Sequence, residues 1–273
     1  MGPLIALLTD FGTRDTYVGV MKAVIATITP KAHVVDLTHE VRPQDVRDGS
    51  YALLVAAPYF PPDTIFVAVV DPGVGGARRP LALRAGGKRF VGPDNGLFSD
   101  VLRESPADIA VLLADPRYRL PDVSTTFHGR DIFAPAAAHM AAGVPLEALG
   151  PHVDSGGLVM LPEPRRFRDA GGVWHGEVWH VDRFGNLVTT LRRRDLDVAL
   201  EAPEARRSAW MVVLGDTEIK SLNQTFADVE PGEPLAYFGS DGYLEIAVRD
   251  GDAAGRLRAT VGTALRAWQM ERG

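Results

Sequence analysis

The chain of 273 residues contains no cysteine, which excludes disulfides, thiolate nucleophiles and zinc sites built on thiolates. It also has no excess of basic side chains, since 29 Lys and Arg residues stand against 35 Asp and Glu residues, for a net charge of −6. That balance does not favour nucleic acid or an anionic membrane surface as a partner. No apolar run approaches the roughly 18 residues that a membrane span requires.

The first residues, MGPLIALLTDFG, lack a basic leader and reach Asp10 after one short apolar run. This pattern is typical of a first β-strand and not of a secretory signal peptide, so we expect a cytoplasmic protein. Hydrophobic residues make up 46% and charged residues 23% of the chain, which is an ordinary globular balance. The length allows one large domain or two ordinary ones.

Strand and helix signals alternate through the first 161 residues. Apolar periodicity predicts strands in 4–12, 33–37, 64–71, 79–85 and 88–92, helices in 16–28, 46–57 and 96–104, and the start of a helix at 131–143. Residues 108–115 fit a strand or a helix equally well. This alternation predicts an α/β domain over 1–161, with a mostly parallel sheet between helices.

The pattern changes after residue 161. The segment PEPRRFRDAGG, residues 162–172, is rich in Pro, Arg and Gly and has no apolar period, so it is predicted to be a linker. Beyond it, residues 173–191, 208–215, 234–240 and 243–250 carry the alternation of half-buried strands. We therefore expect a smaller, antiparallel, barrel-like β domain over 173–273.

Two predicted strands of the first domain end in aspartate, at Asp10 and Asp71. The carboxyl ends of parallel strands share one edge of the sheet, where ligands bind, although either Asp alone could simply cap a turn. The glycines of VVDPGVGGARRP, residues 69–80, match neither a dinucleotide fingerprint nor a P-loop. We interpret this segment as a turn that returns Arg78 to Asp71.

The segment TTFHGRDIFAP, residues 125–135, places His128 between Phe127 and Gly129 just before a predicted helix. A lone loop histidine is usually solvated, but an apolar ring and a gap beside it favour a binding site. Asp131 suits the first turn of that helix. A metal site of Asp10, Asp71, His128 and Asp131 is conceivable, but no H-x-x-x-H or H-E-x-x-H spacing supports it. We expect no metal.

Two turns of the second domain also carry polar side chains. In WHVDRFGNLVTT, residues 179–190, Asp182 and Asn186 flank a Phe-Gly turn, which a β-hairpin explains as well as a ligand site does. In YFGSDGYLEIAVRDGDAA, residues 237–254, Ser240 lies in a turn and Glu245 lies inside an apolar strand. A carboxylate at that position either faces solvent or has a buried polar partner.

Seven ordered segments cover nearly the whole chain and together resemble one family. They are TDFGTRDTYVGVMKAVI, DLTHEVRPQDV, VVDPGVGGARRP, VGPDNGLFS, TFHGRDIFAPAAAHMAAG, VDRFGNLVTT and GSDGYLEIAV. The family is that of the S-adenosyl-L-methionine (SAM) hydrolases that form adenosine, also called SAM hydroxide adenosyltransferases, which are relatives of fluorinating and chlorinating enzymes. The resemblance implies a homotrimer that binds SAM between the α/β domain of one subunit and the β domain of its neighbour, without a cofactor.

The resemblance also implies roles for particular residues. Asp71, Arg78 and His128 correspond to the group that activates a water molecule. The expected substrate contacts are, in chain order, Asp10, Phe127, Gly129, Asp182, Phe184, Asn186, Ser240, Glu245 and Val248.

Within the substrate set, Asp10 corresponds to the position that holds the ribose hydroxyls. Asp182 and Asn186 correspond to positions that hold the methionine amino and carboxylate groups, and Ser240 falls in the same region. Glu245 and the backbone near Val248 match the surroundings of the adenine. Many relatives have Asn and a small loop after this strand, whereas here the sequence runs Arg-Asp-Gly-Asp over 249–252, so the adenine contacts are expected to differ in detail.

Comparison with the halogenating relatives favours water as the nucleophile. Where they carry Tyr and Thr near the halide, this chain has Asp71 and Val74, and where the fluorinating enzyme offers a Ser hydroxyl it has Gly129. A carboxylate there would repel a halide. We therefore expect hydrolysis of SAM to adenosine and methionine. The alternatives are a halogenase using chloride, a non-catalytic adenosine- or SAM-binding protein, and a metal-dependent hydrolase.

Overall fold

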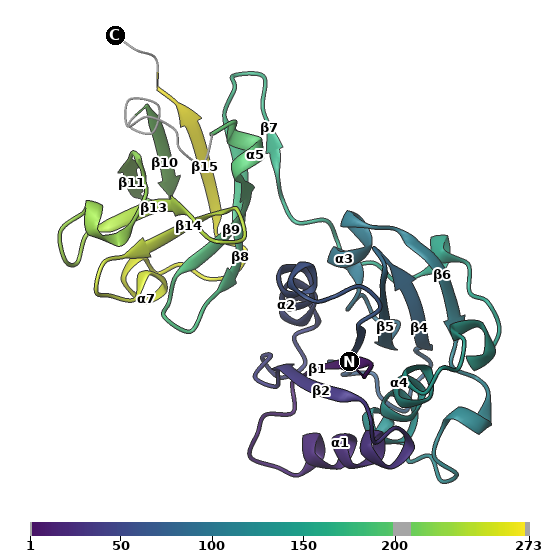
Figure 1. Ribbon diagram of the computed structural model, residues 1–273. Helices are drawn as coiled ribbons and strands as arrows, with labels where there is room; N and C mark the ends of the chain where they lie inside the picture. Colours follow the sequence, from purple (N-terminus) through teal and green to yellow (C-terminus); the bar gives the residue numbers. More distant parts are fainter. Residues whose placement is uncertain (1, 199–208, 271–273) are drawn as a thin grey trace. The chain divides into compact units, whose positions relative to one another are not determined.

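The computed structural model describes residues 2–198 and 209–270. The chain divides into two compact units, Met1–Leu161 and Pro162–Gly273, which are called unit 1 and unit 2 below (Figure 1). The helices in the described parts of the chain are all too short or too polar to cross a membrane.

Unit 1 contains a six-stranded sheet in the order β2-β1-β3-β5-β4-β6. Its elements are β1 Leu4–Thr9, α1 Tyr17–Ile28, β2 His33–Thr38, α2 Val46–Ala56, β3 Ile65–Val69, β4 Pro80–Ala85, β5 Lys88–Pro93, α3 Ser99–Glu104, β6 Ala107–Leu112 and α4 Ala134–Ala141. Strands β2, β1, β3 and β5 are parallel to one another, and β4 runs antiparallel to both β5 and β6. The prediction of a mostly parallel sheet with helices is confirmed.

The two faces of this sheet are covered by different helix pairs, α1 with α4 and α2 with α3 (Figure 1). Alternate strand residues point to opposite faces, so Leu7 packs in the cluster with α1 and α4 while Leu8 lies against α2. Close approach of α2 requires Gly49, where a Cβ atom would lie 2.8 Å from Leu97 and 3.0 Å from Val70.

Two segments of unit 1 refine the sequence-based predictions. Residues 108–115, which fitted strand or helix, contain β6, because antiparallel pairing with β4 satisfies its backbone groups. The helix expected from residue 131 begins with a π-helical turn, Gly129–Phe133, that continues into α4. Pro135 lies in the first turn of α4, and the Asp131 carbonyl four residues before it accepts the Leu120 N–H at 2.9 Å instead of a helical N–H.

Unit 2 is built on a nine-stranded, mostly antiparallel sheet in the order β11-β10-β15-β8-β9-β14-β13-β12, with β7 paired to β8. Its elements are β7 Phe167–Arg168, β8 Trp174–Val181, β9 Leu187–Arg192, α5 Arg193–Leu196, β10 Trp210–Leu214, β11 Thr217–Lys220, β12 Leu222–Asn223, β13 Pro234–Phe238, β14 Tyr243–Val248, α7 Ala253–Leu257 and β15 Ala264–Gln269. Contacts between β11 and β13 nearly close the sheet, so the barrel-like prediction is confirmed.

Two sequence-based boundaries in unit 2 differ from the structure. Strand β7 lies inside 162–172, the expected linker, because Phe167 and Arg168 pair with β8 and so belong to the sheet. The strand predicted at 208–215 is β10, and Ser208 itself lies outside the described residues.

Candidate active site

Strands β1 and β3 bring two of the predicted carboxylates to one edge of the sheet. The strands are parallel neighbours with Thr9 opposite Val69, so Asp10 and Asp71 both follow at their carboxyl ends. The Asp10 carboxylate accepts a hydrogen bond from the backbone N–H of Gln44, at 2.8 Å.

Asp71 and Arg78 form a buried ion pair. Arg78 Nε lies 3.0 Å from Asp71 Oδ1 and 2.9 Å from Oδ2, and Nη2 lies 2.5 Å from Oδ2. The two side chains are only 4% and 9% exposed, respectively. A guanidinium held on two of its nitrogens is fixed in orientation as well as position. The predicted return of Arg78 to Asp71 is therefore present in the structure.

The glycine-rich turn between these two residues allows the chain to pack against a distant segment. Gly75 has a φ of +75°, and a Cβ atom there would lie 2.2 Å from the carbonyl oxygen of Thr125. Only glycine fits both constraints without displacement. The turn thereby lies against the segment that leads to His128.

Arg78 joins the carboxylate to the imidazole. Its Nη2 lies 2.6 Å from His128 Nδ1. Because a guanidinium has only donors, Nδ1 must be the acceptor, so His128 is neutral and carries its proton on Nε2. Burial, followed by the positive charge of Arg78, lowers the pKa of His128 from its ordinary value of 6.5. The three residues form one hydrogen-bonded chain with Arg78 at its centre.

Aromatic side chains form a wall beside this chain. The ring of Phe127 lies 5.9 Å from that of Phe11 and 5.2 Å from that of Tyr17, in edge-to-face contacts. A Cβ atom at Gly129 would lie 3.3 Å from Phe127 and 3.2 Å from Met21, so the glycine keeps this space open. A cavity of about 420 Å³ is lined by Phe11, Tyr17, Ser124, Thr126, Phe127 and Arg130.

The fourth residue of the conceivable metal site, Asp131, is engaged elsewhere. It is fully buried, and it accepts hydrogen bonds from the Ser124 backbone N–H at 2.8 Å and from Arg130 Nε at 2.5 Å. Burial alone would raise the pKa of Asp131, but these hydrogen bonds outweigh it and lower the pKa. In residues 2–198 and 209–270 no group of three His, Asp or Glu side chains is arranged to hold a metal ion.

A buried network beneath Asp10 was not expected from the sequence. Thr9 Oγ1 lies 2.9 Å from His39 Nδ1, and His39 Nε2 lies 3.0 Å from Asp36 Oδ1. Thr9 also accepts the Phe11 N–H at 3.2 Å. These contacts hold the strand end that carries Asp10. Local sequence carried no signal for them, because they join β1 to β2 and to the residue that follows β2.

In unit 2, Asp182 closes the turn between β8 and β9. Its Oδ1 accepts the backbone N–H groups of Phe184 and Asn186, each at 2.8 Å, and its Oδ2 accepts Asn186 Nδ2 at 2.8 Å. Phe184 is 76% exposed at the tip. Gly185 has a φ of +83°, and a Cβ atom there would lie 2.0 Å from Asp252 Oδ1. The hairpin explanation of this motif is therefore present in the structure.

Glu245 has a polar partner, which is one of the two alternatives that the sequence left open. Tyr237 donates its hydroxyl to Glu245 Oε2 at 2.5 Å. The two face each other because β13 pairs with β14 in that register, which the spacing of the hairpin could have revealed. Burial raises the pKa of Glu245 against the lowering effect of the Tyr237 hydrogen bond, and the charges of Asp182 and Asp241 raise it further. The charge of Asp182 therefore influences the ionisation of Glu245.

The remaining predicted residues of unit 2 differ in accessibility. Ser240 is exposed in the turn between β13 and β14. Val248 is only 2% exposed, and its carbonyl oxygen accepts the Gly251 N–H at 3.1 Å. In the 249–252 segment, Arg249 Nη1 donates to the Val229 carbonyl at 2.7 Å and Asp252 caps α7. This segment is thus a tight, internally bonded turn.

The structure therefore assembles two sets of predicted residues, one in each unit. Unit 1 holds the carboxylate, guanidinium and imidazole chain with the aromatic wall, and unit 2 holds acidic and amide groups on two adjacent hairpins. Comparison with known proteins defines the class to which this arrangement belongs. Residues 5–150 match the SAM hydroxide adenosyltransferase N-terminal domain, and residues 176–266 match the corresponding C-terminal domain. The chain belongs to the SAM hydroxide adenosyltransferase family.

Individual relatives refine that placement. The chain is 44% identical to the (R)-S-adenosyl-L-methionine hydrolase of Thermus thermophilus, over 95% of this chain and 97% of the relative. It is 42% identical to the protein of the same name from Salinispora tropica, over 97% of both chains, and 30% identical to the Fluorinase of an Actinoplanes species, over 90% of both. A crystal structure of an uncharacterized conserved protein from Thermotoga maritima matches with a TM-score of 0.88 at 36% identity, covering 97% of this chain and all of that one.

The environment of His128 predicts a pH dependence of stability. Because the folded-state pKa of His128 lies below 6.5, the unfolded chain binds its proton first as the pH falls. The free energy of unfolding should therefore decline as the pH drops from 6.5 towards the lowered pKa, and level off below it. We expect His128→Asn, which keeps an acceptor for Arg78, to make this decline shallower in urea titrations measured at a series of pH values.

His139 provides the matched control, because burial also lowers its pKa and it lies away from Asp71 and Arg78. His139→Gln should remove only its own share of the decline. An unchanged slope in His128→Asn would contradict the assignment of a neutral His128.

Proposed function

We propose that this chain hydrolyses SAM, in the (R) form that its relatives' names specify, to adenosine and methionine. The observation that carries the proposal is the hydrogen-bonded chain of Asp71, Arg78 and His128, which lies beside an aromatic wall at the carboxyl edge of a sheet. The oxygen of a water molecule forms a bond to the ribose C5′ while the bond from C5′ to sulfur breaks. The electron pair of that bond passes to sulfur, and the water gives up one proton.

The observed hydrogen bonds support a division of labour in this step. His128 Nδ1 is occupied by Arg78, so the donor of His128 is Nε2–H, which the Ser124 backbone and the water would share. Asp71 is the group left to accept the proton, because its Oδ1 accepts only one bond from Arg78, from Nε, and so retains a lone-pair direction. Arg78 stays charged, holds both partners in place and stabilises negative charge developing on the attacking oxygen.

The charge of the substrate makes a sheltered site favourable. The attacking oxygen gains negative character as the sulfonium loses its positive charge, so opposite charges cancel along the path. A solvent-poor site therefore assists the step, and bulk water hinders it. Holding the oxygen about 3 Å from C5′ and in line with sulfur supplies a further part of the acceleration. The partly buried rings of Phe11 and Phe127 contribute to such surroundings.

The remaining predicted residues would hold the substrate. Asp10, fixed by the Gln44 N–H, would accept the ribose hydroxyls through its other lone pairs. Asp182 and Asn186 would bind the methionine end, with Ser240 near them, and Glu245 and the backbone near Val248 would lie by the adenine. We further propose a homotrimer in which unit 1 of one subunit and unit 2 of its neighbour form each site. The step needs no resident cofactor, and a cytoplasmic location stays a prediction.

The role of Asp71 is tested by Asp71→Asn, which keeps the shape and one acceptor oxygen but removes the basic group. We expect adenosine formation to fall by about a thousandfold or more, as for loss of a general base together with its electrostatic effect. Adenosine is measured by liquid chromatography, and circular dichroism checks the fold because an unpaired Arg78 is destabilising. Near-wild-type turnover by the folded variant would remove Asp71 from the mechanism.

The bond that breaks is tested with oxygen-18 water. We expect the label in the 5′-hydroxyl of adenosine and none in methionine, as read by mass spectrometry, and no 5′-chloro-5′-deoxyadenosine when chloride is added. Label in another product would place the cleavage elsewhere, and the chlorinated nucleoside would show a halogenase. Tight retention of adenosine without turnover would favour a binding protein, and loss of turnover on adding a chelator would favour a metal-dependent enzyme.

The shared site is tested by mixing two inactive variants, Asp71→Asn in unit 1 and Asp182→Asn in unit 2. If each site draws on two neighbouring subunits in a cyclic trimer, random mixing regenerates intact sites at about a quarter of the wild-type number. Refolded or co-expressed mixtures should therefore recover adenosine formation that neither variant shows alone. Absence of any recovery in mixed trimers would place each site within one chain.

A further inference from the structure

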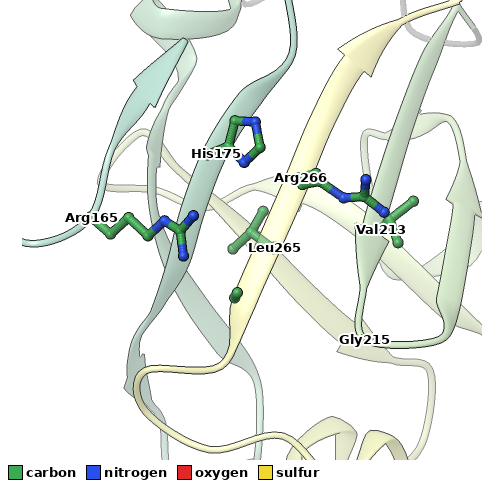
Figure 2. A pocket seen from close by; sticks show the side chains of 7 residues that line it. Arg165, His175, Val213, Gly215, Leu265 and Arg266 are labelled. Atoms are coloured by element: carbon green, nitrogen blue, oxygen red, sulfur yellow. The ribbon is translucent and has the colours of Figure 1, made fainter. Parts of the chain in front are cut away.

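A second cavity lies entirely within unit 2. It has a volume of about 330 Å³ and is drawn in Figure 2. It is lined by Arg165, His175, Val213, Gly215, Ala264, Leu265 and Arg266. None of these residues belongs to the set proposed to act on SAM, so the cavity requires a separate explanation.

Strand register places the basic side chains of this cavity in one row. Arg266 on β15 pairs with His175 on β8 and, on its other side, with Val213 on β10. Paired residues on neighbouring strands point to the same face, so all three share one side of the sheet. Arg165 comes from the segment before β7 and extends towards the same space (Figure 2). Two guanidiniums and an imidazole thus surround a floor that includes the buried Val213.

Aromatic contacts, and not carboxylates, hold the two guanidiniums. Arg165 lies 5.4 Å from the ring of Phe167, and Phe167 stacks on His175 with centroids 4.6 Å apart and planes 4° apart. His175 Nε2 lies in turn 2.8 Å from Asp169 Oδ2. Arg266 lies 6.0 Å from the ring of Trp268. Contact with a ring face orients a guanidinium and leaves the N–H donors at its edge available.

The charge of these two arginines is not neutralised within residues 2–198 and 209–270, where neither guanidinium has an ion pair. Arg166 in the same segment differs, because it lies 3.7 Å from Asp195. Arg168 donates to the neutral Gly172 carbonyl at 3.2 Å. Glu177 accepts the backbone N–H of Arg165, at 3.3 Å.

We propose that this cavity binds a phosphate group, either as inorganic phosphate or as part of a small organic phosphate. Two planar donor forks line it from either side, with His175 between them, which suits an oxoanion that carries more than one negative charge and several acceptor oxygens. A single carboxylate could be satisfied by one of the forks alone. The volume lies at the lower end of the range for small-molecule sites, and Val213 and Ala264 offer apolar contact to a short carbon chain.

The test is calorimetric titration of the full chain with inorganic phosphate and, separately, with glycerol 3-phosphate, at constant ionic strength set by chloride. We expect saturable binding to the wild type. Arg165→Gln and Arg266→Gln should each weaken it about tenfold or more, since each removes charge-assisted hydrogen bonds. Tighter binding of glycerol 3-phosphate would indicate an organic phosphate as ligand, and tighter binding of the inorganic ion would indicate phosphate itself.

Arg168→Gln is the matched control, because it removes one positive charge from the same segment without touching the cavity. It should bind both probes as the wild type does. Retained SAM hydrolysis in Arg165→Gln and Arg266→Gln would show that these variants are folded and that the cavity is separate from the SAM site. The proposal is overturned if neither probe binds saturably, if Arg165→Gln and Arg266→Gln bind like the wild type, or if Arg168→Gln loses as much affinity as they do.

Discussion

The guanidinium of Arg78 is the group on which the candidate active site depends. It donates to Asp71 through two nitrogens and to His128 through one of the same nitrogens, while nearly buried. Because a guanidinium keeps its charge and has no acceptor, it dictates the state of both partners. The carboxylate accepts from it through both oxygens, and the imidazole is neutral with its proton on Nε2. One side chain thereby separates a proton acceptor from a proton donor within a single small site.

The fold buries this ion pair, so the protein is destabilised if either partner is removed. A buried ion pair contributes little net stability, but removal of one partner leaves an uncompensated charge that costs about 3–5 kcal/mol. Parallel strands place Asp71 and Asp10 at the same edge of the sheet, and the turn through Gly75 packs against Thr125 so that Arg78 reaches His128. Pairing the groups in advance also means that little reorganisation is needed when a substrate arrives. We interpret the buried pair as a feature retained for chemistry and not for stability.

In unit 2 the side chains that we propose to contact the substrate also hold the local structure together. The Asp182 carboxylate accepts hydrogen bonds from backbone N–H groups of the turn that carries Phe184 at its tip. The Glu245 carboxylate accepts a hydrogen bond from the Tyr237 hydroxyl. These bonds fix acidic groups on neighbouring hairpins. The cavity of unit 2 has the opposite charge. Its Arg165 and Arg266 contact the rings of Phe167 and Trp268 and form no ion pair with the described residues. One β domain thus presents two regions of opposite charge.

The sequence by itself determined the strand ends at Asp10 and Asp71, the return of Arg78 after a glycine turn, the two-domain plan and the family resemblance. Each of these follows from local periodicity, turn chemistry or ordered motifs. Only the tertiary structure decided that Arg78 bonds His128, that His39 supports Thr9, that β7 joins the sheet, and that Arg165 reaches the row of Arg266. The physical reason is that local patterns report which face of an element is buried. A hydrogen bond between side chains 50 residues apart, as between Arg78 and His128, depends instead on how separate elements pack.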